Sequence, residues 1–133
     1  MVRGLPGNHE LPDQLPGTEV YNHLSAVSLN ELICSSEFVI ARSGYSTIMD
    51  LVQLGKKNIL IPTPGQPEQE YLAAFLHSKK IIFSVTEDEF VLEKCLQEAK
   101  QFSFKQNEVT HLSLTEVIGE LKGAVKKINK PLT

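Results

Sequence analysis

From Thr18 to about Phe102, the hydrophobic residues alternate between short consecutive runs and helical spacing. The runs are rich in β-branched and other apolar residues, and they predict strands at residues 19–21, 37–41, 58–61 and 81–85. Between the runs, apolar residues recur every three or four positions and predict helices around residues 29–33, 48–54 and 72–76. This alternation is typical of βα units that build a parallel sheet.

Two of the predicted strands are apolar at consecutive positions, 38–40 and 59–61. A strand that is apolar on both faces is covered on both sides, so these two strands are expected at central positions. The predicted fold is therefore α/β, a Rossmann-like three-layer structure with a parallel sheet between helices. Gly55 is expected to end the second helix, and Pro67 is expected in the first turn of the third.

The two ends of the chain differ from this middle part. Residues 1–17 are rich in proline and glycine, and they predict one short strand at residues 2–5 followed by a loop. Residues 112–128 carry an apolar stripe opposite charged residues, which predicts an amphipathic C-terminal helix. Ser113 and Glu116 have the spacing of a capping box for it. We expect one α/β domain over residues 1–133, with the βα units at 18–102.

Composition excludes several classes of protein. The formal net charge of -3 and the lack of a basic block argue against a nucleic-acid partner. No apolar run approaches the roughly 18 residues of a membrane-spanning helix. The first residues lack the apolar stretch of a signal peptide, so we expect a cytoplasmic protein. In that compartment, Cys34 and Cys95 are expected to be reduced, buried thiols.

The first candidate site follows the strand at residues 37–41. A turn of small residues leads there into a helix, and a helix N-terminus at the carboxyl end of a parallel strand suits a phosphate. Gly44 would allow close approach of the backbone, and Asp50 could accept from a sugar hydroxyl. The hydroxyls that could add donors belong to Ser43, Ser46 and Thr47. The alternative is an ordinary helix start, with Ser43 as N-cap and Asp50 in solvent.

The second candidate segment is the loop at residues 62–70, which follows the next strand. The same topology places Gln66, Glu68 and Gln69 on the rim that holds Gly44. Side-chain amides there can bind hydroxyl groups of a polar ligand. Taken alone, a proline-rich loop with acidic residues in a first helical turn is also an ordinary helix start.

Together, these segments resemble the C-terminal nucleotide-sugar-binding domain of MurG-like glycosyltransferases of the GT-B fold. The family pattern is Arg-Ser/Ala-Gly-x-x-Thr-x-x-Glu after a strand, Pro-x-Pro after the next strand, and His/Gln-Gln-x-x-Asn-Ala at the following helix. This chain has Arg-Ser-Gly-Tyr-Ser-Thr-Ile-Met-Asp at 42–50, Ile-Pro-Thr-Pro at 61–64 and Glu-Gln-Glu-Tyr-Leu-Ala at 68–73. The resemblance covers about half of the chain, in matching order and spacing.

The resemblance implies a role for each matched residue. Ser43 and Gly44 would face the donor diphosphate, Asp50 would take the place of the family glutamate at the ribose, and Gln69 would contact the donor sugar. Backbone groups near Leu24 would read the edge of the uracil. The nucleotide-sugar-binding residues implied in all are Leu24, Arg42, Ser43, Gly44, Ser46, Thr47, Asp50, Gln66, Glu68 and Gln69.

Three residues depart from the family pattern, and they leave the identity of the sugar open. Asp50 is one methylene shorter than the family glutamate, Glu68 replaces a histidine or glutamine, and Leu72 replaces an asparagine. The family domain also begins with a strand and a glycine-rich loop that this chain does not contain. The first strand-helix unit is thus expected to be missing, which would leave an unpaired sheet edge. We expect that edge to be closed by pairing of Val2 with Val39 or by self-association.

The function implied by the resemblance is the donor half of a two-domain glycosyltransferase. Such an enzyme transfers a hexosyl or N-acetylhexosaminyl group from a UDP-sugar to an acceptor hydroxyl. The catalytic base is expected in the missing N-terminal acceptor domain, so the chain alone is expected to be inactive. No metal or further cofactor is implied, because no Asp-x-Asp motif is present and backbone N–H groups with Arg42 would meet the charge.

Two other functions fit the same residues. One is a non-catalytic binding subunit of a split glycosyltransferase, and the other is a nucleotide-sugar hydrolase or epimerase of the same fold. The C-terminal helix could dock on a partner domain, or its lysines could meet anionic lipid, a membrane contact that the interleaved acidic residues disfavour. The four histidines, His9, His23, His77 and His111, show no metal-ligand spacing.

Overall fold

The computed structural model describes residues 1–13, 16–105, 115–116, 118–119, 122–123 and 126. The chain divides into two compact units, residues 1–36 and residues 37–133. The candidate segments at residues 42–50 and 62–70 lie in the second unit, and Leu24 lies in the first.

The first unit contains a loop region and one helix, α1, which spans Ala26–Ser35. Ser25 caps this helix, because its side chain accepts a hydrogen bond from the Ser28 backbone N–H at 3.2 Å. The predicted strands at residues 2–5 and 19–21 are reduced to a single parallel bridge between Val2 and Tyr21. The described residues of the glycine- and proline-rich sequence between them form loop, as predicted.

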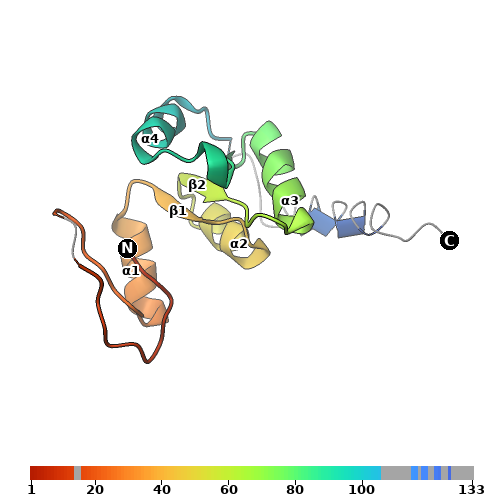
Figure 1. The fold of residues 1–133 in the computed structure, drawn as a ribbon. Helices are drawn as coiled ribbons and strands as arrows, with labels where there is room; N and C mark the ends of the chain where they lie inside the picture. Colours follow the sequence, from red (N-terminus) through yellow and green to blue (C-terminus); the bar gives the residue numbers. More distant parts are fainter. Residues whose placement is uncertain (14–15, 106–114, 117, 120–121, 124–125, 127–133) are drawn as a thin grey trace. The chain divides into compact units, whose positions relative to one another are not determined.

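The second unit contains a parallel sheet in the order β1-β2-β3. Its strands are β1 (Val39–Arg42), β2 (Asn58–Ile61) and β3 (Phe83–Ser84). Its helices are α2 (Tyr45–Gln53), α3 (Pro67–Ser78), the 3₁₀ helix η1 (Glu87–Glu89) and α4 (Leu92–Gln101). In Figure 1, α2 lies below β1 and β2, and α4 lies above them. The α/β class with a parallel sheet is therefore confirmed.

The two strands that were predicted to be central differ in burial. In β2, Ile59 and Leu60 point to opposite faces and both are 0% exposed, so helices cover this strand on both sides. In β1, Ile40 is 40% exposed, and β1 is an edge strand of the three-stranded sheet. The prediction for β1 was therefore wrong, because apolar side chains on both faces do not by themselves reveal what covers them.

Local sequence signals account for the helix ends next to the sheet. Gly55 has φ +64° just beyond α2, a conformation that suits glycine, and its N–H donates to the Val52 carbonyl at 3.0 Å. Pro67 is the first residue of α3, where its missing N–H costs no helical hydrogen bond. Both predictions are confirmed.

An aromatic cluster holds β3 against its neighbours. The His77 ring, from α3, lies 5.4 Å from the Phe83 ring and 5.1 Å from the Phe102 ring, measured between centroids. The Ser84 backbone N–H donates to His77 Nδ1 at 2.9 Å. Burial lowers the pKa of His77, because the charged imidazolium is poorly solvated there. The neutral ring is the form that accepts this hydrogen bond.

Cys34 is exposed and Cys95 is buried, and no disulfide joins them. The expectation of two buried thiols was therefore wrong for Cys34, which lies on α1, a helix without buried residues.

The described residues between 115 and 126 are helical, and Ile118 is 1% exposed. This agrees with the predicted C-terminal helix, whereas the capping residue Ser113 lies outside the described residues. None of the helices described is both long and apolar enough to cross a membrane.

The lowered pKa of His77 predicts an acid-sensitive fold. Protonation of His77 is easier in the unfolded chain, where the reference pKa is 6.5, than in the folded one. The free energy of unfolding should therefore fall as the pH decreases below about 6.5. Urea unfolding of the wild type and of His77→Gln between pH 5 and pH 8 measures this, because all other titrating groups are shared. Equal pH dependences in the two proteins would contradict the prediction.

Candidate functional site

The register of the sheet brings the two candidate segments together. Arg42, the last residue of β1, pairs with Ile61, the last residue of β2. Both strands run in the same direction and end at the same level, so the chain leaves each of them at one edge of the sheet. This is the edge at which parallel α/β sheets bind ligands.

The first of these segments ends in an N-terminus of α2 that no side chain caps. The N-cap is Gly44, with φ −68° and ψ 148°, and it has no side chain to accept from the N–H groups of the first turn. Tyr45 and Ser46 are exposed and Thr47 is half-buried. First-turn N–H groups lack helical partners, so this end of α2 offers donors and a positive dipole end to an anion.

Ser43 is buried and bonded to the protein. It is 0% exposed, and its hydroxyl donates to the Gln69 carbonyl of α3 at 3.3 Å. The alternative interpretation of this segment made Ser43 the N-cap of α2. That assignment was wrong, because the N-cap is Gly44. The Ser43 hydroxyl joins the end of β1 to the first turn of α3, and the hydroxyls left for a ligand are those of Ser46 and Thr47.

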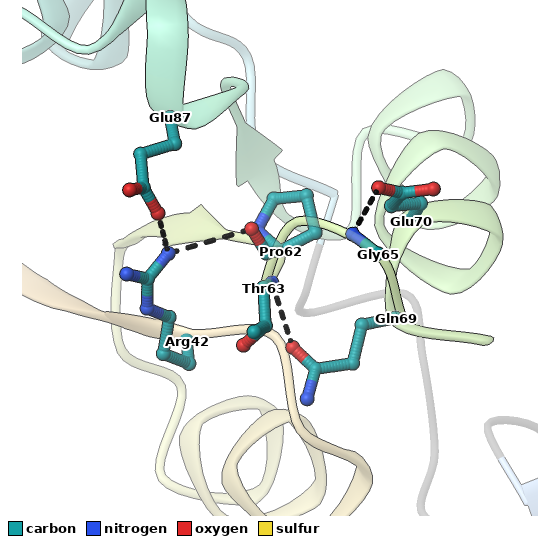
Figure 2. A network of polar contacts seen from close by, with 7 residues as sticks. All are labelled: Arg42, Pro62, Thr63, Gly65, Gln69, Glu70 and Glu87. Carbon is teal, nitrogen blue, oxygen red and sulfur yellow. Dashed lines mark hydrogen bonds and ion pairs between the residues drawn. The ribbon is translucent and has the colours of Figure 1, made fainter. Parts of the chain in front are cut away.

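The second segment is held in place by side chains from the helix that follows it (Figure 2). Gln69 Oε1 accepts from the Thr63 backbone N–H at 3.0 Å, and Glu70 Oε1 accepts from the Gly65 backbone N–H at 3.3 Å. Gly65 has φ +79°, which favours glycine in this turn. The loop between β2 and α3 is thus fixed to α3.

These contacts also fix the orientation of the Gln69 amide. Its oxygen faces a backbone N–H, so its nitrogen must point the other way, where Nε2 donates to Gln66 Oε1 at 2.9 Å. An amide nitrogen carries two hydrogens, and Gln66 takes one of them. Gln69 therefore presents one N–H donor to a ligand at this edge.

Arg42 lies across the ends of the strands. Its Nη1 donates to Glu87 Oε2 at 2.6 Å and to the Pro62 carbonyl at 3.4 Å (Figure 2). The Arg42 and Glu87 side chains are each about half exposed. The sequence pattern does not reveal Glu87 as a residue of this site, because it lies 45 residues from Arg42 and no local motif marks it.

The other residues predicted for the site take no part in the contacts described above. Asp50, on α2, and Glu68, in the first turn of α3, are exposed. Leu24 belongs to the first unit, where it directly precedes the cap of α1. Leu72, at the position of the family asparagine, is only 6% exposed and belongs to the core. The side chain that departs from the family pattern thus packs inside the protein.

A cavity of about 610 Å³ opens beside the site, between α3 and η1. It is lined by Pro62, Pro64, Glu70, His77, Ser84 and Glu87, among others. Within the described part of the chain, no three His, Cys, Asp or Glu side chains lie close enough together to hold a metal ion.

Comparison with known proteins identifies the class of this domain. The sequence pattern of the glycosyltransferase family 28 C-terminal domain matches residues 9–128. The chain belongs to this family, which confirms the resemblance to the C-terminal domain of MurG-like glycosyltransferases.

Two curated proteins have sequences similar to this chain. An uncharacterized glycosyltransferase of Methanosarcina acetivorans is 35% identical over 103 residues, which cover 75% of this chain and 26% of the relative. A UDP-N-acetylglucosamine–N-acetylmuramyl-(pentapeptide) pyrophosphoryl-undecaprenol N-acetylglucosamine transferase of Rhodopseudomonas palustris is 38% identical over 45 residues, 34% of this chain and 12% of that protein. The chain therefore spans only a small part of either relative. No solved structure matches it significantly.

The bond between Ser43 and α3 predicts an effect on stability. Ser43→Ala removes a buried hydroxyl and its hydrogen bond, so the free energy of unfolding should fall by about 1 kcal/mol. Ser46→Ala, in the exposed first turn of α2, should change it by less than about 0.5 kcal/mol. Urea unfolding of both variants measures the difference. Equal effects would show that the Ser43 bond does not support the fold.

Proposed function

We propose that this chain is the donor-binding domain of a glycosyltransferase and that its donor is a UDP-sugar. The observation that carries the proposal is the uncapped N-terminus of α2, which lies beside the loop held by Gln69 at the shared edge of β1 and β2. A helix N-terminus recognises the phosphates, and an oriented amide recognises a hydroxyl or carbonyl oxygen. Membership of the family and the name of the Rhodopseudomonas relative, a UDP-N-acetylglucosamine-dependent transferase, support it.

In this proposal, each residue has a role that follows from its place. The first-turn N–H groups after Gly44 bind the diphosphate, with the Ser46 and Thr47 hydroxyls as further donors. Asp50, exposed on α2, accepts from a ribose hydroxyl. Gln69 donates its available N–H to the donor sugar. The cytoplasm, where we expect the protein, would supply the nucleotide sugar.

The same geometry would contribute to the transfer reaction. As the bond between sugar and diphosphate breaks, negative charge grows on the departing UDP. The positive end of α2 stabilises that charge more strongly than it stabilises the intact donor, which lowers the barrier. The acceptor hydroxyl belongs to a second substrate, and the base that deprotonates it comes from another domain, so the chain alone binds the donor without turning it over.

The experiment that tests this proposal is an amide-resolved NMR titration of the 133-residue chain with UDP and, separately, with GDP. We expect UDP to shift the amide signals of Gly44, Ser46, Asp50 and Gln69, and GDP to shift them much less. Shifts at Leu24 would place the uracil as the family resemblance implies. No shift at millimolar UDP would contradict the proposal.

Gly44→Ala is the loss-of-binding variant for this titration. A Cβ at this position would meet only Thr47 Oγ1, at 3.9 Å, so the free protein accommodates it. The added methyl group would stand where the phosphate approaches the first turn of α2. We expect the affinity for UDP to fall about tenfold or more, equivalent to about 1.4 kcal/mol. Unchanged affinity would place the phosphate elsewhere.

Gln69→Glu tests recognition of the sugar separately from the nucleotide. The carboxylate still accepts from the Thr63 N–H, but it has no N–H for the sugar. We expect the ratio of the affinity for UDP-N-acetylglucosamine to that for UDP to fall about fivefold to tenfold. Gln66→Glu adds the same charge and keeps the acceptor for Gln69, so the ratio should change less. Calorimetric titrations give both affinities, and equal ratios in all three proteins would contradict the role of Gln69.

A further inference from the structure

The ion pair between Arg42 and Glu87 connects the proposed site to η1. Arg42 ends β1, Glu87 begins η1, and Arg42 Nη1 lies 2.6 Å from Glu87 Oε2. Figure 2 shows the guanidinium between this carboxylate and the Pro62 carbonyl. The contact thus joins the end of β1 to the segment that follows β3, across the end of β2.

Only one nitrogen of Arg42 takes part in these contacts. Nη1 carries two hydrogens, which serve Glu87 and Pro62. Nη2 and Nε carry three more, and no acceptor for them is found among the described residues. The guanidinium is therefore held through Nη1 alone, so the side chain can turn toward another anion once the contact with Glu87 is broken.

Arg42 is also close enough to the N-terminus of α2 to serve a ligand there. It precedes the Gly44 cap by two residues, which span at most roughly 7 Å. The long arginine side chain spans such a distance. A phosphate at the first turn of α2 and the Glu87 carboxylate would then compete for the same cation.

The residues around Glu87 are acidic, and whether a ligand competes with Glu87 for Arg42 depends on the charge of that ligand. All three residues of η1 are acidic and exposed, Glu87, Asp88 and Glu89. In the described structure, Glu89 accepts from the Thr86 hydroxyl and does not contact Arg42. Arg42 is thus paired with one carboxylate, that of Glu87, and a neutral ligand has no means of displacing this carboxylate from the guanidinium. A ligand phosphate can displace it, because the phosphate carries negative charge.

We propose that Glu87 is a specificity-determining residue of the donor site, because its carboxylate occupies Arg42 until a ligand phosphate takes its place. The inference rests on the proposed function, since it concerns the phosphates of the same donor. Glu87 lowers the affinity for the nucleotide and leaves the affinity for an uncharged nucleoside unchanged. The site then discriminates between ligands by their phosphate charge.

The test compares Glu87→Gln with Glu89→Gln in calorimetric titrations with UDP and with uridine at low, constant ionic strength. Both variants remove one negative charge from η1, but only the first removes the contact with Arg42. Because exposed ion pairs are weak, we expect Glu87→Gln to raise the affinity for UDP about twofold to fivefold. Glu87→Gln should leave the affinity for uridine unchanged. Glu89→Gln should change the affinity for UDP less than 1.5-fold, which corresponds to roughly 0.2 kcal/mol.

A double-mutant cycle shows whether Glu87 acts through Arg42. In the Arg42→Gln background, the effect of Glu87→Gln on UDP affinity should disappear. Weaker or unchanged UDP binding in Glu87→Gln would overturn the inference. So would an equal effect of Glu89→Gln, or an effect that persists without Arg42.

Inorganic pyrophosphate separates failure of this inference from failure of the proposed function. If the wild type does not bind UDP, the proposed function fails, and the NMR signal of Arg42 Nε–Hε still reports on the exchange of anions. A pyrophosphate-induced shift that appears at lower concentration in Glu87→Gln supports the inference. No shift, or an identical titration in both proteins, overturns it.

Discussion

The site depends on one feature of the sheet, the parallel register that sets Arg42 beside Ile61. This pairing makes two strands end at the same level, so two loops and two helix N-termini share one edge. A shift of one residue would exchange the faces of every β1 side chain and separate the loops. The alternation of half-buried and exposed positions along β1 favours this register, because a shift of one residue would turn the exposed Arg42 toward the half-buried face.

At this edge, the backbone of α2 leaves N–H groups available, whereas side chains of α3 fix the neighbouring loop. The N-terminus of α2 keeps its donors available because Gly44 cannot cap them. The neighbouring loop is fixed by Gln69 and Glu70, so that it is already ordered before a ligand arrives. A binding site that is ordered in advance loses less conformational entropy on binding. The structure therefore combines an uncapped helix N-terminus with an ordered loop beside it.

The sequence predicted the elements whose signals are local. Helices α2 and α3 and strand β2 follow from apolar spacing, from Gly55 and from Pro67, each of which acts within a few residues. The contact of Glu87 with Arg42 joins residues that are far apart in the chain, and no periodicity reveals it. The exposure of Ile40 was missed for a related reason, because a sequence shows which residues are apolar but not which neighbours cover them.

The double task of Gln69 limits which residues can replace it. In the proposed site, a side chain at this position must accept from the Thr63 backbone N–H and also keep an N–H donor for the ligand. Few side chains carry both groups at that length, so the position leaves little room for variation. Gln66 and Glu68 have no such obligation to the backbone in the described structure. If the donor binds as proposed, attempts to engineer the choice of sugar should therefore begin with these two neighbours and leave the amide of Gln69 in place.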